Sequence, residues 1–408
     1  MITTDILIVG GGQGGAQVAI SLRQGGYEGS IVMVGDEPDM PYDRPPLSKD
    51  YLAGDKTVDR LLLRKAEFWE KNKIDLCVGK RIASIDAEAH VAITDDEEKF
   101  QYGYLIWAAG GYARPLPIPG GDLSGIHVIR TREQVDLLRL EVENAREIVV
   151  IGGGYIGLEA AAVLTKQGKK VTILEAESRV LARVAGAPIS EFYESEHRAQ
   201  GVTIHTGVAV THLEGENGRV KSVVLANGDE ISADLVIAGI GLIPNKDIIE
   251  AAGAKCSNGV EVDELCRTSL PDIFSIGDCA CHANKFAEGA FLRVESVPNA
   301  VGQAKAVVSV ILGDPKPFVD VPWFWSNQYD LKLQTAGLNH GYDETILRGD
   351  PATRSFSLIY LRKGQVVAVD AVNMIKDFMA GKKLVEKGLV VDKASLADTD
   401  ILLKSLLG

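Results

Sequence analysis

The sequence lacks long apolar runs and has a deficit of positive charge. No stretch approaches the roughly 20 apolar residues that a membrane span requires, so we expect no crossing of a membrane. Lysine and arginine number 43 against 56 aspartates and glutamates, which gives a net charge of −13. This balance argues against nucleic acid or an anionic membrane surface as a partner, because both need a basic face.

Cysteine is too scarce for a disulfide framework. The chain has 5 cysteines in 408 residues, an odd and sparse set that fits a reducing compartment. A strand-like pattern begins almost at Met1 and leaves no room for a secretory signal, so we expect a cytoplasmic protein. Cys279, Cys281 and His282 lie together, but no second ligand pair stands at a recognised spacing. We therefore expect ordinary thiols and no metal site.

What remains is the composition of a globular protein. With 46% hydrophobic and 24% charged residues over 408 positions, the chain is long enough for two or three domains.

The sequence carries one glycine pattern twice. Each copy follows a short apolar run, at residues 5–9 and 147–151, and precedes a helical pattern. In a G-x-G-x-x-G turn, glycine permits a sharp bend and close approach of a pyrophosphate, while the helix N-terminus offers free N–H groups. Two such turns predict two dinucleotide sites. Their glycines are Gly10, Gly12 and Gly15 in the first copy and Gly152, Gly154 and Gly157 in the second.

Each glycine pattern is followed by a second strand that ends in an acid. An acid about 20 residues past the glycines is placed to accept hydrogen bonds from an adenosine ribose. Asp36 is the first candidate in the first copy and Glu37 the second. Glu175 is the candidate in the second copy.

The order of glycine turn, acid, hairpin, strand and glycine stop occurs twice, which indicates an internal duplication. The predicted fold class is α/β, with two Rossmann-like dinucleotide-binding domains plus a C-terminal α+β domain of antiparallel strands. This plan is typical of two-dinucleotide flavoproteins and differs from simple dehydrogenases, which have one nucleotide site. The predicted domains are a first dinucleotide-binding domain in two parts, at residues 1–112 and 246–318, a second one at residues 113–245, and a C-terminal interface domain at residues 319–408.

A proline-rich run makes a family resemblance specific. It reads Pro41-Tyr42-Asp43-Arg44-Pro45-Pro46-Leu47-Ser48-Lys49. With the first glycine turn and the later motifs, the chain resembles the FAD-dependent, NADH-dependent ferredoxin reductases of bacterial oxygenase systems. The resemblance implies FAD as cofactor, NADH as the source of a hydride, and single-electron transfer to an iron-sulfur ferredoxin, of the [2Fe-2S] type. It makes the first dinucleotide-binding domain the FAD-binding domain and the second the NAD-binding domain.

The resemblance also implies roles for single residues. It places Lys49 near the reactive ring, Glu159 against the nicotinamide carboxamide and paired with Lys49, and Trp325 beside the flavin on the ferredoxin-facing side. Glu159 has a plainer alternative, an acid at a helix start favoured by the helix dipole. The further residues expected to bind cofactor are Gly14, Arg44, Ile82, Arg130, Tyr155, Ile156, Gly241, Asp278 (on a ribityl hydroxyl) and Val297 (in the segment under the flavin pyrimidine).

The chain departs from the family pattern at two positions, with Ala109 in place of a threonine and Asn327 in place of a common aspartate. It also lacks the closely spaced cysteine pair through which many duplicated flavoproteins pass electrons, so electrons must leave the flavin directly. The alternatives are a rubredoxin reductase, an NADH oxidase-type flavoprotein, and a signalling flavoprotein similar to apoptosis-inducing factor. The sequence does not identify the ferredoxin, the terminal oxygenase or the oligomeric state.

Overall fold

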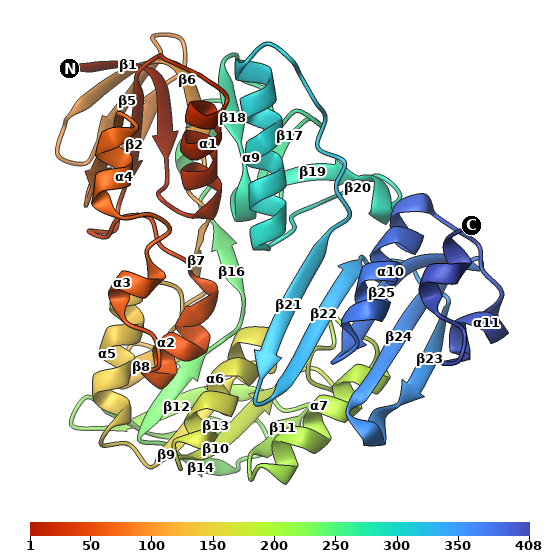
Figure 1. The fold of residues 1–408 in the computed structure, drawn as a ribbon. Helices are drawn as coiled ribbons and strands as arrows, with labels where there is room; N and C mark the ends of the chain where they lie inside the picture. The colour runs from red at the N-terminus through yellow and green to blue at the C-terminus, as the bar shows by residue number, and fades with distance from the viewer. The chain divides into compact units, whose positions relative to one another are not determined.

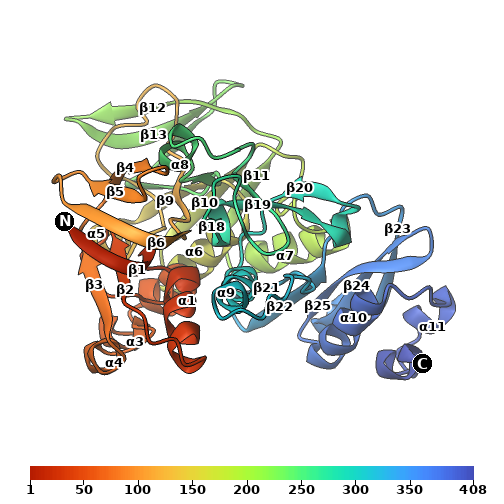
Figure 2. The ribbon, with the colours of Figure 1, turned by 90° about the horizontal axis from the view of Figure 1, so that it is seen from above.

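The computed structural model describes residues 1–408, and their contacts divide the chain into two compact units (Figures 1 and 2). Unit 1 comprises Met1–Arg44, Val58–Tyr112 and Ile243–Phe324, and unit 2 comprises Pro45–Thr57, Ala113–Leu242 and Trp325–Gly408. Residues 45–57 pack with unit 2, although we expected them in the first domain. The domain boundaries given above remain predictions.

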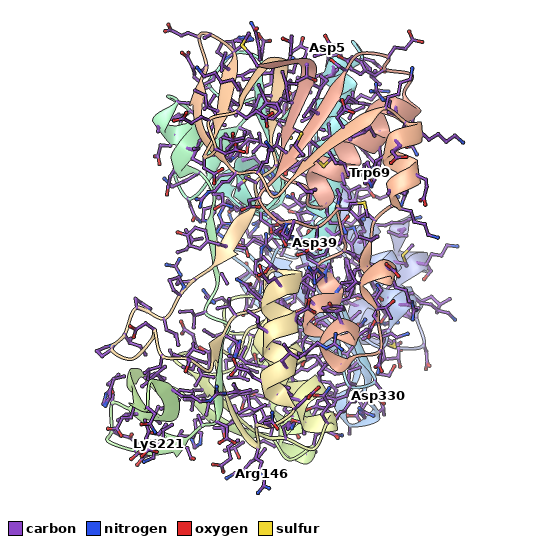
Figure 3. All side chains as sticks on the ribbon, turned by 90° about the vertical axis from the view of Figure 1, so that its left-hand side faces the viewer. Asp5, Asp39, Trp69, Arg146, Lys221 and Asp330 are labelled. Atoms are coloured by element: carbon purple, nitrogen blue, oxygen red, sulfur yellow. The ribbon has the colours of Figure 1, made fainter.

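Unit 1 is built on a seven-stranded sheet in the order β3-β2-β1-β6-β5-β4, with β18 paired to β6. Its central pairs are parallel, as expected for strands joined through a crossover helix, and β4 and β5 form the antiparallel hairpin. Asp5, labelled in Figure 3, accepts a 2.7 Å hydrogen bond from Ser30 N at the entry to β2. The strands are β1 (Ile2–Val9), β2 (Ile31–Gly35), β3 (Ile74–Val78), β4 (Ile82–Asp86), β5 (Val91–Thr94), β6 (Lys99–Trp107) and β18 (Ile273–Ser275).

Two helices that are distant in sequence lie side by side on this sheet, namely α1 (Gln13–Gln24) and α9 (Val297–Ile311) (Figures 1 and 2). Both contribute buried residues to the core formed with β1 and β18. The chain therefore returns to unit 1 after residue 243 and completes it. The other elements of unit 1 are α3 (Val58–Leu61), α4 (Ala66–Lys71), α8 (Asp247–Ala251), β17 (Val260–Val262), η2 (Gly277–Cys279), β19 (Ala280–Asn284), η3 (Lys285–Ala287) and β20 (Ala290–Leu292).

Unit 2 repeats the parallel plan and adds an antiparallel sheet. The parallel sheet runs β11-β10-β9-β15-β8, and a small hairpin sheet runs β12-β13-β14. These elements are β8 (Ile126–His127), α5 (Arg132–Val142), β9 (Glu147–Ile151), α6 (Tyr155–Lys166), β10 (Lys170–Glu175), α7 (Ala187–Ala199), β11 (Thr203–Thr206), β12 (Val210–Glu216), β13 (Arg219–Leu225), β14 (Glu230–Ser232) and β15 (Leu235–Ala238). Short elements at the ends of its segments are η1 (Pro45–Ser48), α2 (Asp50–Ala53), β7 (Gly111–Ala113) and β16 (Leu242–Pro244).

The C-terminal sheet runs β21-β22-β25-β24-β23, and α10 packs on β22 and β25. β22 alternates buried and exposed residues at its start, whereas β24 and β25 are buried almost throughout. The elements are β21 (Trp323–Gln328), β22 (Leu331–Gly337), β23 (Glu344–Asp350), η4 (Pro351–Thr353), β24 (Ser355–Arg362), β25 (Gln365–Val372), α10 (Ile375–Lys387), α11 (Lys393–Ala397) and η5 (Leu403–Leu407).

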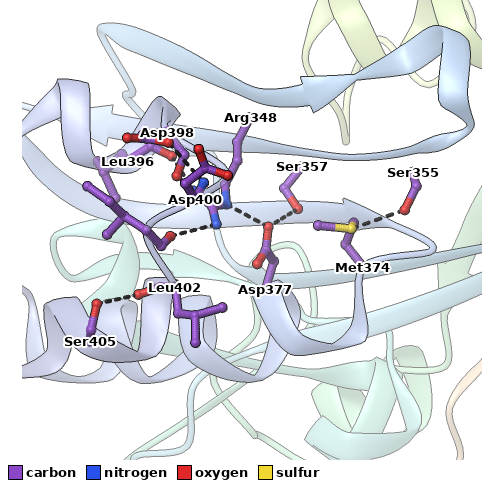
Figure 4. A network of polar contacts seen from close by, with 11 residues as sticks. Arg348, Ser355, Ser357, Met374, Asp377, Leu396, Asp398, Asp400, Leu402 and Ser405 are labelled. Carbon is purple, nitrogen blue, oxygen red and sulfur yellow. Dashed lines mark hydrogen bonds and ion pairs between the residues drawn. The ribbon is translucent and has the colours of Figure 1, made fainter.

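One buried guanidinium attaches the C-terminal segment to this sheet (Figure 4). Arg348 is 2% exposed, and its Nε donates to Asp377 at 2.9 Å. Its other nitrogens donate to main-chain oxygens of the last residues, including Ile401 O at 2.8 Å. Because a buried charge must be paired and hydrogen-bonded, these contacts fix the path of the chain end.

A second buried carboxyl links the C-terminal sheet to the start of α7 in unit 2. Asp370 on β25 is 3% exposed and accepts a hydrogen bond from the Tyr360 hydroxyl, which accepts one from Gly186 N at 2.7 Å. Gly186 is the N-cap of α7. Burial raises the pKa of Asp370 to about 7.

This carboxyl predicts that stability falls as the pH rises. At pH values between the unfolded pKa of about 3.9 and the folded pKa, Asp370 is protonated in the folded chain but ionised in the unfolded chain. Its contribution to the free energy of unfolding is therefore complete below about pH 4 and is lost toward pH 7. The slope is about 1.4 kcal/mol per pH unit at most. Thermal unfolding of the wild type and of Asp370→Asn at pH 5 and pH 8 should show a smaller pH difference in the variant. An identical difference in both proteins would contradict the assignment.

Candidate functional site

The first glycine turn has a backbone that only glycine permits. Gly10 has φ +111°, and a Cβ there would lie 2.3 Å from Ala108 O. A Cβ on Gly15 would lie 2.1 Å from Gly10 O, so α1 approaches the end of β1 too closely for any side chain.

The second turn reproduces this geometry. Gly152 has φ +107°, and a Cβ there would lie 2.4 Å from Gly239 O. A Cβ on Gly157 would lie 2.2 Å from Gly152 O. The repeated sequence pattern therefore builds the same strand, turn and helix twice.

The middle glycines differ from these because the protein does not fill the space beside them. A Cβ on Gly12 or Gly154 would meet no protein atom within 4 Å. Each is the N-cap of its helix, without a side-chain cap and without an acid in the first turn. The first N–H groups of both helices are thus available to an anion, and the residues at both turns fit a dinucleotide pyrophosphate.

The acids after the two turns occupy different positions. Gly10 N donates to Val34 O in unit 1, and Gly152 N donates to Leu174 O in unit 2. The residues that follow these two acceptors, Gly35 and Glu175, therefore occupy equivalent positions. Glu175 Oε2 accepts from Gly153 N at 2.6 Å, and its Oε1 accepts from Glu177 N at 2.8 Å. Glu175 therefore lies at the second glycine turn, whereas glycine stands at the equivalent place in unit 1.

In unit 1 the two candidate acids have different surroundings. Glu37 accepts a 2.5 Å hydrogen bond from the Tyr42 hydroxyl and forms an ion pair with Arg44. Asp36 is exposed. Asp36 is therefore open to a ligand, whereas Arg44, which we expected to bind cofactor, is paired with Glu37. The cofactor roles of both residues remain predictions.

Asp278 lies in η2, shortly after the end of β18. The preceding Gly277 has φ +78°, and its N–H donates to Gln303 Oε1 at 2.7 Å. Arg293 Nη1 donates to Asp278 O at 2.7 Å. Gln303 is fully buried on α9, the helix that begins at Val297, and sequence reasoning did not identify it.

A buried carboxylate is the centre of the polar site in unit 2. Glu159 is 2% exposed and is the fifth residue of α6, so it is not an exposed acid at the helix start. Its Oε2 accepts from Lys49 Nζ at 2.6 Å and from Ser48 Oγ at 2.5 Å. Its Oε1 accepts from Ser326 Oγ at 2.6 Å. The pairing of Lys49 with Glu159 agrees with the sequence expectation, and the two serines were missed.

Three more predicted residues of unit 2 lie around the second glycine turn or follow a strand. Tyr155 and Ile156 open α6, and the Ile156 side chain is 46% exposed despite its apolar character. Gly241 has φ +107° with no protein atom within 4 Å of a Cβ. Burial and the nearby Asp370 raise the pKa of Tyr155 well above its ordinary value.

The remaining predicted residues are less distinctive. Arg130 precedes Thr131, which forms a capping box with Gln134 at the start of α5. Ile82 is 2% exposed and belongs to the core of unit 1, and Trp325 is half-buried on β21. Their contacts with a cofactor remain predictions.

All five cysteines are free, and all lie in unit 1. Cys77 and Cys256 are partly exposed, and the other three are buried. No three histidine, cysteine, aspartate or glutamate side chains are grouped so that they could hold a metal ion. None of the helices combines the length and apolar character needed to span a membrane.

Comparisons with known proteins agree with this geometry. The family described as pyridine nucleotide-disulphide oxidoreductase matches residues 4–304, and the reductase C-terminal family matches residues 323–407. A 5,5'-dehydrodivanillate O-demethylase ferredoxin reductase subunit of Sphingobium sp. is 53% identical over 98% of both chains. A ferredoxin–NAD(P)(+) reductase of Sphingomonas sp. is 50% identical over 95% of this chain and 94% of that protein. The reductase in a crystal structure of a covalent putidaredoxin reductase–putidaredoxin complex has a TM-score of 0.96 and 39% identity, covering 100% of this chain and 99% of that one.

Proposed function

The chain belongs to the pyridine nucleotide-disulphide oxidoreductase family, and from this membership we propose that it is an FAD-dependent ferredoxin reductase of an oxygenase system. It accepts a hydride from NADH and delivers the two electrons singly to two molecules of an iron-sulfur ferredoxin. The observation that carries the proposal is a pair of open glycine turns, at Gly12 and Gly154, in a chain that has no disulfide to relay electrons.

The residues at the two turns would hold the two dinucleotides. In unit 1 the first turn, Asp36 and Asp278 would bind FAD. In unit 2 the second turn and Glu175 would bind NADH, with Glu159 on the nicotinamide carboxamide. FAD supplies the conversion between two-electron and one-electron chemistry.

The chain itself supplies binding, orientation and charge. The free N–H groups of α1 and α6 neutralise pyrophosphate charge. The Lys49 side chain is only 14% exposed, and a buried ammonium needs a counter-ion. Glu159 supplies it at 2.6 Å and so keeps the cation in place. A buried ion pair of this kind fixes both side chains, because moving either one leaves the other uncompensated.

The experiment that tests the proposal is NADH-driven reduction of a panel of purified ferredoxins and a rubredoxin, followed by absorbance. We expect reduction of at least one [2Fe-2S] ferredoxin. Reduction of the rubredoxin alone would establish the alternative function, and oxygen consumption without either acceptor would favour an oxidase.

The purified protein should be yellow and should release its FAD on denaturation. Open space at Gly12 and the exposed Asp36 fit the pyrophosphate and ribose of FAD, and no attachment residue is evident in the sequence. Absorbance of the supernatant after acid precipitation measures the released flavin. A colourless protein that takes up no FAD on reconstitution would contradict the proposal.

Replacing Lys332 by glutamate should weaken ferredoxin binding. Ferredoxins of this class are generally acidic and this chain has a net charge of −13, so docking should depend on local cations. Lys332 is exposed on β22, in the same unit as Trp325, and Arg64 in unit 1 is the second candidate. We expect the ferredoxin concentration for half-maximal turnover to rise about tenfold at low salt.

Lys221→Glu is the matched control, because Lys221 is an exposed lysine of unit 2 on β13 and undergoes the same charge change. Reduction of ferricyanide by NADH bypasses docking and should be unchanged in both variants. Equal effects of the two substitutions on ferredoxin would exclude Lys332 from the interface.

A further inference from the structure

β21 directs alternate side chains to opposite sides, as a strand must. Ser326 and Gln328 are 0% and 1% exposed, whereas Asn327 between them is exposed. The two buried polar side chains lie between Glu159 of α6 and His197 of α7, all of them in unit 2.

These side chains form an unbroken series of hydrogen bonds. Tyr329 Oη lies 3.0 Å from His197 Nδ1, and His197 Nε2 lies 2.8 Å from Gln328 Oε1. Gln328 Nε2 lies 3.2 Å from Ser326 Oγ, which lies 2.6 Å from Glu159 Oε1.

The carboxylate sets the direction of every bond. Glu159 can only accept, so the Ser326 proton points to it and Gln328 must donate to Ser326 through Nε2. Gln328 Oε1 then faces His197, which must carry its proton on Nε2. The bare Nδ1 of a neutral His197 is left to accept from the Tyr329 hydroxyl. All four donors therefore point toward Glu159.

The burial of His197 preserves this arrangement. His197 is 0% exposed, and burial lowers its pKa to about 4, so the ring is neutral near pH 7. Hydrogen bonds that point the same way along a chain polarise one another, which strengthens the last bond to the carboxylate.

Counting acceptor positions shows what the series does to Glu159. A carboxylate has about four lone-pair positions, two on each oxygen. Lys49 and Ser48 take both positions on Oε2, and Ser326 takes one on Oε1. One acceptor position remains, and it lies on the oxygen that Ser326 holds.

We infer that Ser326, Gln328 and His197 are positioning residues for the nicotinamide: they hold Glu159 so that its last acceptor position serves the carboxamide N–H of the coenzyme. The inference rests on the proposed function, because it requires NADH to bind at the second glycine turn. None of the three needs to touch the coenzyme.

The test is equilibrium titration of the FAD-loaded protein by calorimetry with NAD⁺ and with ADP-ribose, which lacks the nicotinamide. For Ser326→Ala we expect the Kd for NAD⁺ to rise about tenfold, the effect of one hydrogen bond to a charged group, with the Kd for ADP-ribose unchanged. His197→Leu should raise the Kd for NAD⁺ about threefold. His197→Gln should restore it, because an amide can both donate to Gln328 and accept from Tyr329.

Ser222→Ala is the matched control, because Ser222 is a buried strand serine of unit 2 whose hydroxyl has no partner; it should leave both affinities unchanged. Equal weakening of NAD⁺ and ADP-ribose by Ser326→Ala would overturn the inference, since it would indicate general damage to the unit. The inference would also be overturned if His197→Gln had as high a Kd for NAD⁺ as His197→Leu. Failure of the wild type to bind either ligand would instead refute the proposed function.

Discussion

Flavin reduction by NADH should slow by about a hundredfold in Glu159→Ala, which corresponds to about 2.7 kcal/mol of barrier, with FAD retention unchanged. The substitution removes the proposed acceptor of the carboxamide and leaves the Lys49 ammonium without its counter-ion in a site where its side chain is 14% exposed. Stopped-flow bleaching of the flavin measures the rate, and released flavin measures retention. Glu230→Ala, an exposed acid on β14 of the same unit, is the control.

A double variant separates charge from shape. Glu159→Ala alone and Lys49→Met alone each leave one buried charge unpaired, at a cost of about 3–5 kcal/mol, whereas the double variant leaves none. The double variant should therefore unfold at a higher temperature than either single variant while reduction by NADH stays slow. An unchanged reduction rate in Glu159→Ala would return this residue to a structural role.

The preference for NADH over NADPH should approach a thousandfold in kcat/KM. Glu175 would face the 2′-phosphate, and one like-charge contact at about 4 Å is worth roughly 4 kcal/mol at an effective dielectric constant of about 20, before screening. Its carboxylate is held by Gly153 N at 2.6 Å and Glu177 N at 2.8 Å and so is not free to swing away.

The cations near Glu175 in sequence do little to reduce its repulsion of a 2′-phosphate. Arg179 donates to Ala185 O at 2.7 Å and to Ser190 Oγ of α7 at 2.6 Å, which fixes its guanidinium, and the exposed Arg183 remains. Glu175→Ala should raise kcat/KM for NADPH by at least tenfold. Glu177→Ala changes the net charge equally and should not. Equal specificity constants for the two coenzymes in the wild type would remove Glu175 from the ribose site.

The fold was predictable where its signals are local. Both glycine turns, their strands and the C-terminal antiparallel strands follow from glycine spacing and apolar periodicity. Helix α6 begins at Tyr155, inside the glycine turn, because Gly154 is its N-cap. Leu158 in this first turn is fully buried, but the glycines around it are poor helix formers, so the sequence pattern does not reveal the start.

The site was predictable only in part, because its contacts cross long stretches of chain. Glu159 follows from the resemblance, but Ser48 and Ser326 reach it from 111 and 167 positions away, and no local pattern indicates that either serine meets this carboxylate. Gln303 meets Gly277 across 26 positions. Small polar residues of this kind acquire a role only when packing excludes water from them, which a single sequence does not display.

The distribution of cysteine has a consequence for chemical resistance. Thiol reagents and peroxide attack the thiolate, and burial raises the pKa of the Cys77 thiol and raises that of Cys256 to about 11, so both of the partly exposed cysteines stay protonated near neutral pH. Unit 2, which holds the second glycine turn, Glu175 and Glu159, contains no thiol at all. The half of the protein that would receive NADH is therefore inert to sulfhydryl chemistry, and the enzyme should tolerate alkylating agents that inactivate disulfide-relay members of its family.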